Sequence, residues 1–305
     1  MGQYIIDAHA HLWLNVDTVV NGSPIHPLEP NRSRSLFFGE ERQMLPPYMT
    51  DGQNTAERFL SNMDYAQVSA AVITQEFIDG LQNEYLLKVK QQYHDRFFCF
   101  GMPDWRKPNY YETSLALLAI GFEGLKVPAA RLPKAFLEED KFRQVLQLMQ
   151  TKGAILGIEL HDGDAQTGRM EELIQDFPRL KIAIGHFGMV TREGWMSQIR
   201  LARHKNVFIE SGGITWLFND EFYPFPSAIR AIKEAADEVG MEKLMWGSDY
   251  PRTITAITYK MSYDFVTKSK ELTNEEKCLF LCDNAKQFFG FGKLKELPYI
   301  KNMSE

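Results

Sequence analysis

Short apolar runs rich in β-branched residues recur along the chain, and each is followed by a loop and an amphipathic stretch. Apolar residues that continue without strict alternation indicate strands buried on both faces, as in a parallel sheet. We predict eight such strands, at Tyr4–His9, Val68–Thr74, Phe97–Gly101, Phe122–Val127, Ala154–Leu160, Leu180–Gly185, Val207–Glu210 and Leu244–Ser248. The helices predicted between them include Thr55–Tyr65, Glu84–Tyr93, Glu139–Gln150, Arg169–Asp176, Gly194–Arg203 and Ser227–Val239.

Eight strands that alternate with helices are typical of an α/β fold, the (β/α)₈ or TIM barrel. We therefore expect residues 1–305 to form a single domain, because barrels of this kind often reach this length. A doubly wound open sheet is the competing architecture, since strand order is not written in one sequence. Its usual dinucleotide signature, G-x-G-x-x-G, follows none of the predicted strands, and there is no Walker A motif.

One connection departs from this rhythm, because residues 14–53 are too long for an ordinary loop. The segment contains five prolines, several aromatic residues and the cations Arg32 and Arg34. It is either a lid over the substrate or a mobile excursion without a catalytic role. Active sites of barrels lie at the C-terminal ends of the strands, and this segment begins at the C-terminal end of the first strand. We therefore favour a distorted barrel with a lid inserted after that strand.

The composition narrows the classes of function. Apolar residues make up 44% of the chain and charged residues 24%, which is ordinary for a globular protein. The formal net charge of −6 argues against a broad basic surface for nucleic acid or for a membrane. There is no run of about 20 apolar residues, and the start, Met-Gly-Gln-Tyr, lacks the basic region of a signal peptide. We expect a soluble cytoplasmic protein that acts on a small molecule, and the composition leaves room for a homodimer.

Two histidines close to the end of the first strand are the first candidates for chemistry. His9 and His11 are two residues apart, so on an extended strand both imidazoles point to the same side, which in a barrel is the lumen. Paired in this way they can bind zinc or a similar divalent ion through neutral nitrogens. A His-x-His pair alone is weak evidence, because polar residues that merely end a strand are the commoner explanation of such a pair.

The other strand ends add weight to a metal site. His161, His186 and Asp249 follow the fifth, sixth and eighth strands, so four of the seven histidines in the chain lie at strand ends. On the fifth strand Glu159 shares the parity of His161, and we prefer His161 as the ligand because it lies nearer the rim. Other candidates near these ends are Asp7, expected deeper in the barrel in a supporting role, and Lys126, expected either on an anionic substrate or packed on the rim.

Several ordered motifs together resemble the amidohydrolase superfamily. They are Asp-Ala-His-Ala-His-Leu-Trp from Asp7, Ile-Gly-His-Phe-Gly from Ile184, Val-Phe-Ile-Glu-Ser-Gly-Gly from Val207, Trp-Gly-Ser-Asp-Tyr-Pro from Trp246 and Asp-Asn-Ala-Lys-Gln-Phe-Phe from Asp283. More narrowly, the set is similar to the amidohydrolase-related (amidohydrolase 2) group, which contains sugar-acid lactonases, pyrone-dicarboxylate lactonases and metal-dependent decarboxylases. The resemblance covers most of the chain, and the motifs follow one another in the same order as in the family.

The resemblance implies a distorted barrel with one divalent metal ion, zinc first and manganese second, at the C-terminal ends of the strands. It implies His9, His11, His161 and Asp249 as ligands, with His186 beside the metal-bound water or the substrate. Some lactonases of the group work without a metal. The long segment 14–53 departs from the usual pattern of the group, and the fifth strand is the least secure part of the alignment.

The expected chemistry follows from such a site. A bound divalent ion makes hydroxide available near neutral pH, Asp249 transfers the proton, and His186 steadies the developing oxyanion. Arg252, near the eighth strand, and Arg32 and Arg34, in the expected lid, suit a carboxylate on the substrate. Trp13 and Trp216 suit the walls around a ring. We therefore expect a metal-dependent hydrolase of a carboxylate-bearing cyclic ester of the lactone type. The alternatives are a non-oxidative decarboxylase on the same metal and a catalytically silent barrel that binds a ligand.

Overall fold

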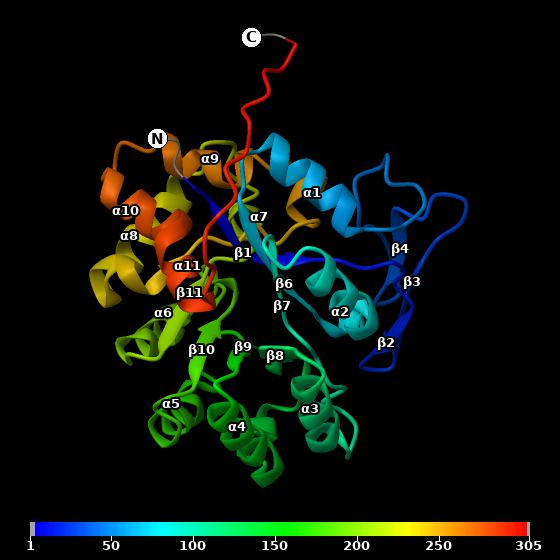
Figure 1. Ribbon diagram of the computed structural model, residues 1–305, viewed down its shortest axis with the longest axis vertical. Helices are drawn as coiled ribbons and strands as arrows, with labels where there is room; N and C mark the ends of the chain where they lie inside the picture. The colour runs from blue at the N-terminus through cyan, green and yellow to red at the C-terminus, as the bar shows by residue number, and fades with distance from the viewer. Residues whose placement is uncertain (1–3, 304–305) are drawn as a thin grey trace.

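Eight short parallel strands form the centre of the molecule, and helices surround them (Figure 1). The computed structural model describes residues 4–303, so the first residues, on which the expected absence of a signal peptide rests, lie outside the described part. Each central strand overlaps one that the apolar pattern predicts. The strands are β1 (Ile6–His11), β6 (Ala70–Thr74), β7 (Phe97–Cys99), β8 (Gly124–Pro128), β9 (Ile155–Glu159), β10 (Lys181–Ile184), β11 (Val207–Glu210) and β12 (Leu244–Met245).

The strands pair in two parallel sheets that are joined to each other at both edges. One sheet has the order β1-β6-β7 and the other the order β12-β11-β10-β9-β8. At one seam the amide of Lys126 donates to the carbonyl of Gly101 at 2.9 Å. At the other the amide of Asp249 donates to the carbonyl of His9 at 2.8 Å, and Ala10 pairs with Tyr250. The expected (β/α)₈ architecture is confirmed, and the second seam runs directly through the candidate site.

The strands are apolar on both faces because both faces are buried. Alternate residues such as Ile6, Val72 and Phe100 fill the barrel, together with Phe288 and Phe289 from a C-terminal helix, while Ile73 and Leu156 pack outward against the helical layer. Among the described residues, none of the helices combines the length and apolar character needed to span a bilayer. The helices are α1 (Ala56–Tyr65), α2 (Asn83–Gln92), α3 (Tyr110–Ala119), α4 (Asp140–Lys152), α5 (Thr167–Asp176), α6 (Trp195–Arg200), α7 (Ile214–Leu217), α8 (Pro226–Val239), α9 (Met261–Lys268), α10 (Asn274–Cys278) and α11 (Asn284–Phe289).

The segment 14–53 is structured rather than a simple loop. It folds into an antiparallel sheet in the order β2-β3-β4-β5, which stands beside the barrel (Figure 1). Backbone hydrogen bonds in both directions between Trp13 and Asn54, at 2.9 and 3.0 Å, clamp its entry to its exit. The Asn54 side chain also donates to the carbonyl of His11 at 2.6 Å, so the base of this sheet is fixed against β1. The four strands are Thr18–Val20, Ser23–Pro27, Arg34–Phe37 and Glu40–Gln43.

Candidate metal centre and active-site pocket

Three side chains from the two ends of the chain meet at the β12–β1 seam. The Nε2 atoms of His9 and His11 lie 3.0 Å apart. Oδ1 of Asp249 lies 3.6 Å from the first and 3.3 Å from the second. A tetrahedral ion with bonds of about 2.0–2.1 Å holds its ligand atoms roughly 3.3–3.4 Å apart. The three donor atoms are therefore spaced as such an ion requires.

The hydrogen bonds on the far side of each ring favour the same conclusion. Nδ1 of His9 lies 2.6 Å from Glu210, and Nδ1 of His11 lies 2.6 Å from Asp79. Carboxylate oxygens only accept, so each Nδ1 donates, and in the neutral ring the lone pair is then on Nε2. Two lone pairs that face each other at 3.0 Å need a proton or a metal ion between them. Burial would lower the pKa of His11, but Asp79 and Asp249 raise it well above its usual value, so in the metal-free protein the proton is on His11, where a divalent ion can replace it. Histidines supported by carboxylates in this way are typical of metal sites, and His9, His11 and Asp249 fit a divalent ion.

The electrostatics keep the cluster ionised. Burial alone would raise the pKa of Asp249, but a hydrogen bond from His11 and the charge of His186 hold that pKa well below its usual range. Burial lowers the pKa of His9, the main effect on this ring, although Glu210 opposes it. Asp249 is thus a carboxylate at neutral pH and His9 a neutral ring, which are the forms that bind metals.

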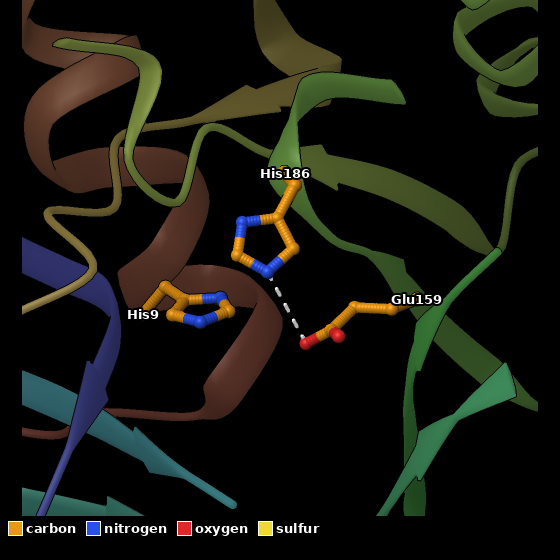
Figure 2. Close-up of side chains that lie close together, drawn as sticks. All are labelled: His9, Glu159 and His186. Carbon is orange, nitrogen blue, oxygen red and sulfur yellow. Dashed lines mark ion pairs between the residues drawn. The ribbon is translucent and has the colours of Figure 1, made fainter. Parts of the chain in front are cut away.

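A second group shares one of these ligands. His9, Glu159 and His186 converge from β1, β9 and the turn after β10 (Figure 2). Nε2 of His186 lies 3.4 Å from Glu159 Oε1, while its Nδ1 donates to the carbonyl of Gly212 at 2.8 Å. Because Nδ1 of His9 is engaged by Glu210, only its Nε2 can serve either group. The two groups are therefore alternatives for one ion rather than two metal sites.

The ion pair at Glu159 favours the first group, because Lys126 Nζ lies 2.7 Å from Glu159 Oε1 and already neutralises that carboxylate. Burial would lower the pKa of the His186 ring, but Glu159, Asp249 and Glu210 raise it to about 9. In the metal-free protein His186 is then an imidazolium at neutral pH. Its position, with the ring centroid 4.7 Å from that of His9, suits a hydrogen-bond donor that faces a substrate beside the cluster.

The structure does not bring His161 into either group. The strand β9 ends at Glu159, so His161 lies two residues beyond it, and Nε2 of its ring contacts the carbonyl of Leu132 at 2.9 Å. Glu159 occupies the inward position on β9 instead. Lys126 also differs from expectation, because its Nζ lies 2.7 Å from Glu159 Oε1 with only 3% of its side chain exposed. It neutralises Glu159 within the barrel and does not line the pocket.

Asp7 lies deeper than the histidines and holds the seam together. Its carboxylate accepts hydrogen bonds from the amide of Ser248 at 2.8 Å, from the Ser248 hydroxyl at 2.5 Å and from the Tyr259 hydroxyl at 2.8 Å. Burial raises the pKa of Asp7 to about 7. This contact fixes the backbone directly before Asp249 and agrees with a supporting role.

Two residues at the site have left-handed backbones. Asp249 has φ 57° and His186 has φ 55°, a conformation that costs non-glycine residues about 1–3 kcal/mol each. Both follow the ends of their strands, and the turn aims each side chain at the pocket instead of along the barrel wall. Other non-glycine residues of the described chain share this conformation, but these two line the pocket, so part of the strain lies where the chemistry is expected.

A pocket of about 700 Å³ opens above the cluster. Its walls include Trp13, Trp216 and, from the sheet of residues 14–53, Phe37. That sheet therefore borders the pocket, as a lid would. Arg252 lines the pocket too, stacked with its guanidinium carbon 3.8 Å from the centroid of the Trp216 ring.

The other cations of the pocket are not those that the sequence suggested. Arg32 pairs with Glu29 and Arg34 with Glu41, and neither lines the pocket. Arg42, Arg131 and Lys134 line it instead. Arg131 is partly engaged, because its Nε lies 3.3 Å from Oε2 of the buried Glu76.

Some partners were missed by the sequence argument. Glu210 ends β11 at a strand terminus like the others, so the same rule that selected the histidines would have found it. Asp79 lies in the turn Phe77–Asp79, and no periodic signal connects it to His11. Trp216 lies in α7, and none connects it to Asp249, to which its indole donates a hydrogen bond. Glu76 and Arg131 were missed for the same reason, because they meet only across neighbouring strand ends.

The comparisons with known proteins identify a family and a fold. A family model described as amidohydrolase matches residues 6–291. Among curated proteins, none matches the sequence significantly. Solved structures resemble the chain in fold.

Three of these structures illustrate the range. A probable 2-pyrone-4,6-dicarboxylic acid hydrolase from Acinetobacter baumannii, with citric acid bound, has a TM-score of 0.69 and 21% identity over 94% of this chain and 99% of its own. An amidohydrolase from Burkholderia multivorans with bound zinc has a TM-score of 0.68 and 15% identity over the same shares. The 5-carboxyvanillate decarboxylase from Novosphingobium aromaticivorans, with manganese, has a TM-score of 0.57 and 18% identity over 77% of this chain and 80% of its own.

Proposed function

The chain belongs to the amidohydrolase family, and from this premise we propose that it is a metal-dependent hydrolase of a small, carboxylate-bearing cyclic ester. The observation that carries the proposal is the cluster of His9, His11 and Asp249, in which each imidazole is backed by a carboxylate. Zinc is the preferred ion, because two imidazoles and a carboxylate at tetrahedral spacing leave one position for water. The zinc-bound and manganese-bound structural neighbours support a divalent ion of this kind.

The residues around the cluster have distinct tasks in hydrolysis. A divalent ion, when bound there, supplies a more acidic water and polarises a carbonyl oxygen. Asp249 enters the reaction as a carboxylate, so it can accept the proton of the attacking water and return it to the leaving oxygen. His186, cationic and directed at the same space, donates a hydrogen bond to the oxyanion that develops.

The pocket supports a small anionic substrate. Its volume of about 700 Å³ is in the range for small-molecule sites. Guanidinium groups bind carboxylates with two parallel hydrogen bonds, and Arg252 and Arg131 present such groups to the pocket. The aromatic walls formed by Trp13, Trp216 and Phe37 suit a flat ring between them.

Metal content tests the cluster. The protein purified without added metal should contain close to one divalent ion per chain, measured by elemental analysis. Asp249→Asn and the double variant His9→Ala/His11→Ala should lose most of it while keeping their circular dichroism spectra. His161→Ala is the matched control, because this histidine lines the same pocket but lies outside the cluster, and its metal content should equal that of the wild type. A fully active wild type with less than about a tenth of an equivalent would contradict the metal-dependent mechanism.

Isotope incorporation tests the reaction. Candidate substrates are 2-pyrone-4,6-dicarboxylate and the lactones of sugar acids, turned over in ¹⁸O-labelled water with carbon dioxide measured at the same time. Hydrolysis puts one labelled oxygen into the product acid and releases no carbon dioxide. Asp249→Asn should lower kcat by at least about 10²–10⁴-fold, with a smaller effect on KM, because its proton transfer occurs in the transition state and the loss of metal adds to the effect.

A decarboxylase is the second candidate, because one observation favours it. An imidazolium at His186 beside the cluster is placed to protonate a substrate carbon as carbon dioxide leaves. In that case carbon dioxide would match substrate loss and the organic product would carry no label. This result would overturn the hydrolase proposal and leave the metal site in place.

A further inference from the structure

We infer that Trp216 is a positioning residue for Asp249, which fixes how this carboxylate meets the metal ion. The indole Nε1 of Trp216 donates to Asp249 Oδ2 at 2.7 Å, while Oδ1 of the same carboxylate faces His9 and His11. One oxygen is thus held by the indole and the other is left for the ion. The inference rests on the proposed metal site and names a residue outside the ligand set.

The fold holds the indole in place from several sides. Gly213 (φ 72°) precedes α7, and a Cβ at this position would lie 1.7 Å from Trp216 Nε1, so only glycine lets the indole lie against this backbone. The Arg252 guanidinium stacks on the indole with its carbon 3.8 Å from the ring centroid. The ring of His186 meets it edge to face, with centroids 6.1 Å apart. The indole is therefore fixed before any ion or substrate arrives.

The arrangement determines the mode of ligation. A carboxylate with both oxygens free can bind an ion with both or rotate between them. With Oδ2 engaged by the indole, Asp249 would present Oδ1 alone to a divalent ion. Groups that hold a ligand in this way typically change metal affinity by 10–100-fold when they are removed.

Zinc affinity measured against a chromophoric chelator tests the inference. Trp216→Phe keeps an aromatic face for Arg252 but removes the N–H, and its zinc affinity should fall by about 10–100-fold. The matched control is Trp13→Phe, because Trp13 also lines the pocket but donates its N–H to the carbonyl of Gly52 at 3.0 Å. Its zinc affinity should stay within about threefold of the wild type. Equal affinity for zinc in Trp216→Phe and the wild type would overturn the inference.

A second measurement does not depend on metal. In the metal-free protein labelled with ¹⁵N at the indoles, the five tryptophans give five N–H signals, and Trp216→Phe identifies its own by loss. Asp249→Asn replaces a charged acceptor by a neutral one, so the Trp216 signal should move more than the other four. If the wild type binds no zinc, the proposed function fails and this spectrum alone decides the role of Trp216. A Trp216 signal that stays in place in Asp249→Asn refutes it.

Discussion

Replacing Lys126 by methionine removes one partner of an ion pair inside the barrel. Lys126 Nζ lies 2.7 Å from Glu159 Oε1, and the two side chains are 3% and 9% exposed. The variant leaves Glu159 as a buried carboxylate whose remaining cationic neighbour is His186, at 3.4 Å. Because a buried charge without its partner is costly, we expect a large loss of stability.

The magnitude follows from this geometry. Breaking a buried ion pair costs about 3–5 kcal/mol, and because His186 stays near Glu159 we expect the lower end, about 3 kcal/mol. An unfolding entropy of about 2.1 cal/mol/K per residue amounts to about 0.64 kcal/mol/K for 305 residues, so a loss of about 3 kcal/mol lowers Tm by about 5 °C. The free energy of unfolding from urea titrations, followed by circular dichroism, measures the loss directly.

An exposed ion pair supplies the control. Lys268 Nζ lies 2.5 Å from Asp264, closer than the buried pair, but 64% of the Lys268 side chain is exposed. Lys268→Met should leave the free energy of unfolding close to that of the wild type, because solvent screens such pairs. If Lys126→Met loses no more free energy of unfolding than Lys268→Met, the barrel does not need the buried pair and the reasoning is wrong.

The pH dependence gives the same variant a second readout. Burial would raise the pKa of Glu159, but Lys126 and His186 hold it well below its usual value of 4.5. A depressed pKa contributes stability that is present above pH 4.5 and is lost as the pH falls through the value in the folded state. Without Lys126 the pKa of Glu159 rises, so the stability of Lys126→Met should begin to fall at a higher pH than that of the wild type.

Two further predictions concern the same side of the barrel. Gly212→Ala should lower zinc affinity more than tenfold in the chelator assay, because a Cβ there would lie 2.7 Å from Nδ1 of His9. The control is Gly168→Ala, whose Cβ would have open space around it and should leave zinc affinity unchanged. An equal loss of zinc affinity in both variants would contradict this explanation. In the metal-free protein, ¹⁵N NMR should find the His186 pKa near 9, so that its contribution to stability is present below pH 6.5 and is lost as the pH rises through about 9. Glu159→Gln should move that midpoint toward 6.5, and an unchanged midpoint would show that Glu159 does not hold the proton on His186.

The barrel could be predicted because its signal is local. Each central strand is buried on both faces, so its apolar character is continuous and visible without knowledge of its neighbours. The sheet of residues 14–53 was missed although its turns were visible. Asn21-Gly22 and Phe38-Gly39 have positive φ at both positions and join strands β2 to β3 and β4 to β5, and an Asn-Gly pair between short strands is a hairpin signal.

The candidate site was only partly predictable. His9 and His11 were found because the parity of a strand decides which way their rings point. His161 was preferred to Glu159 because it lies nearer the rim, but β9 ends at Glu159, so His161 lies beyond the strand and its parity no longer determines where its ring points. Asp79, Arg131 and Trp216 are brought to their partners by turns and neighbouring strands, so their contacts exist only after the barrel has closed.

The seam between β12 and β1 has a consequence for how the protein is made. The amide of Ser248 meets Asp7 across a separation of 241 residues, and the amide of Asp249 meets the carbonyl of His9 beside it. A ribosome delivers the two histidines early and the carboxylate late, so no nascent chain that ends before Asp249 can assemble the three donors. Contacts so distant in sequence form slowly and late in folding. Metal acquisition at this cluster would therefore be coupled to closure of the barrel and would follow synthesis of all eight central strands.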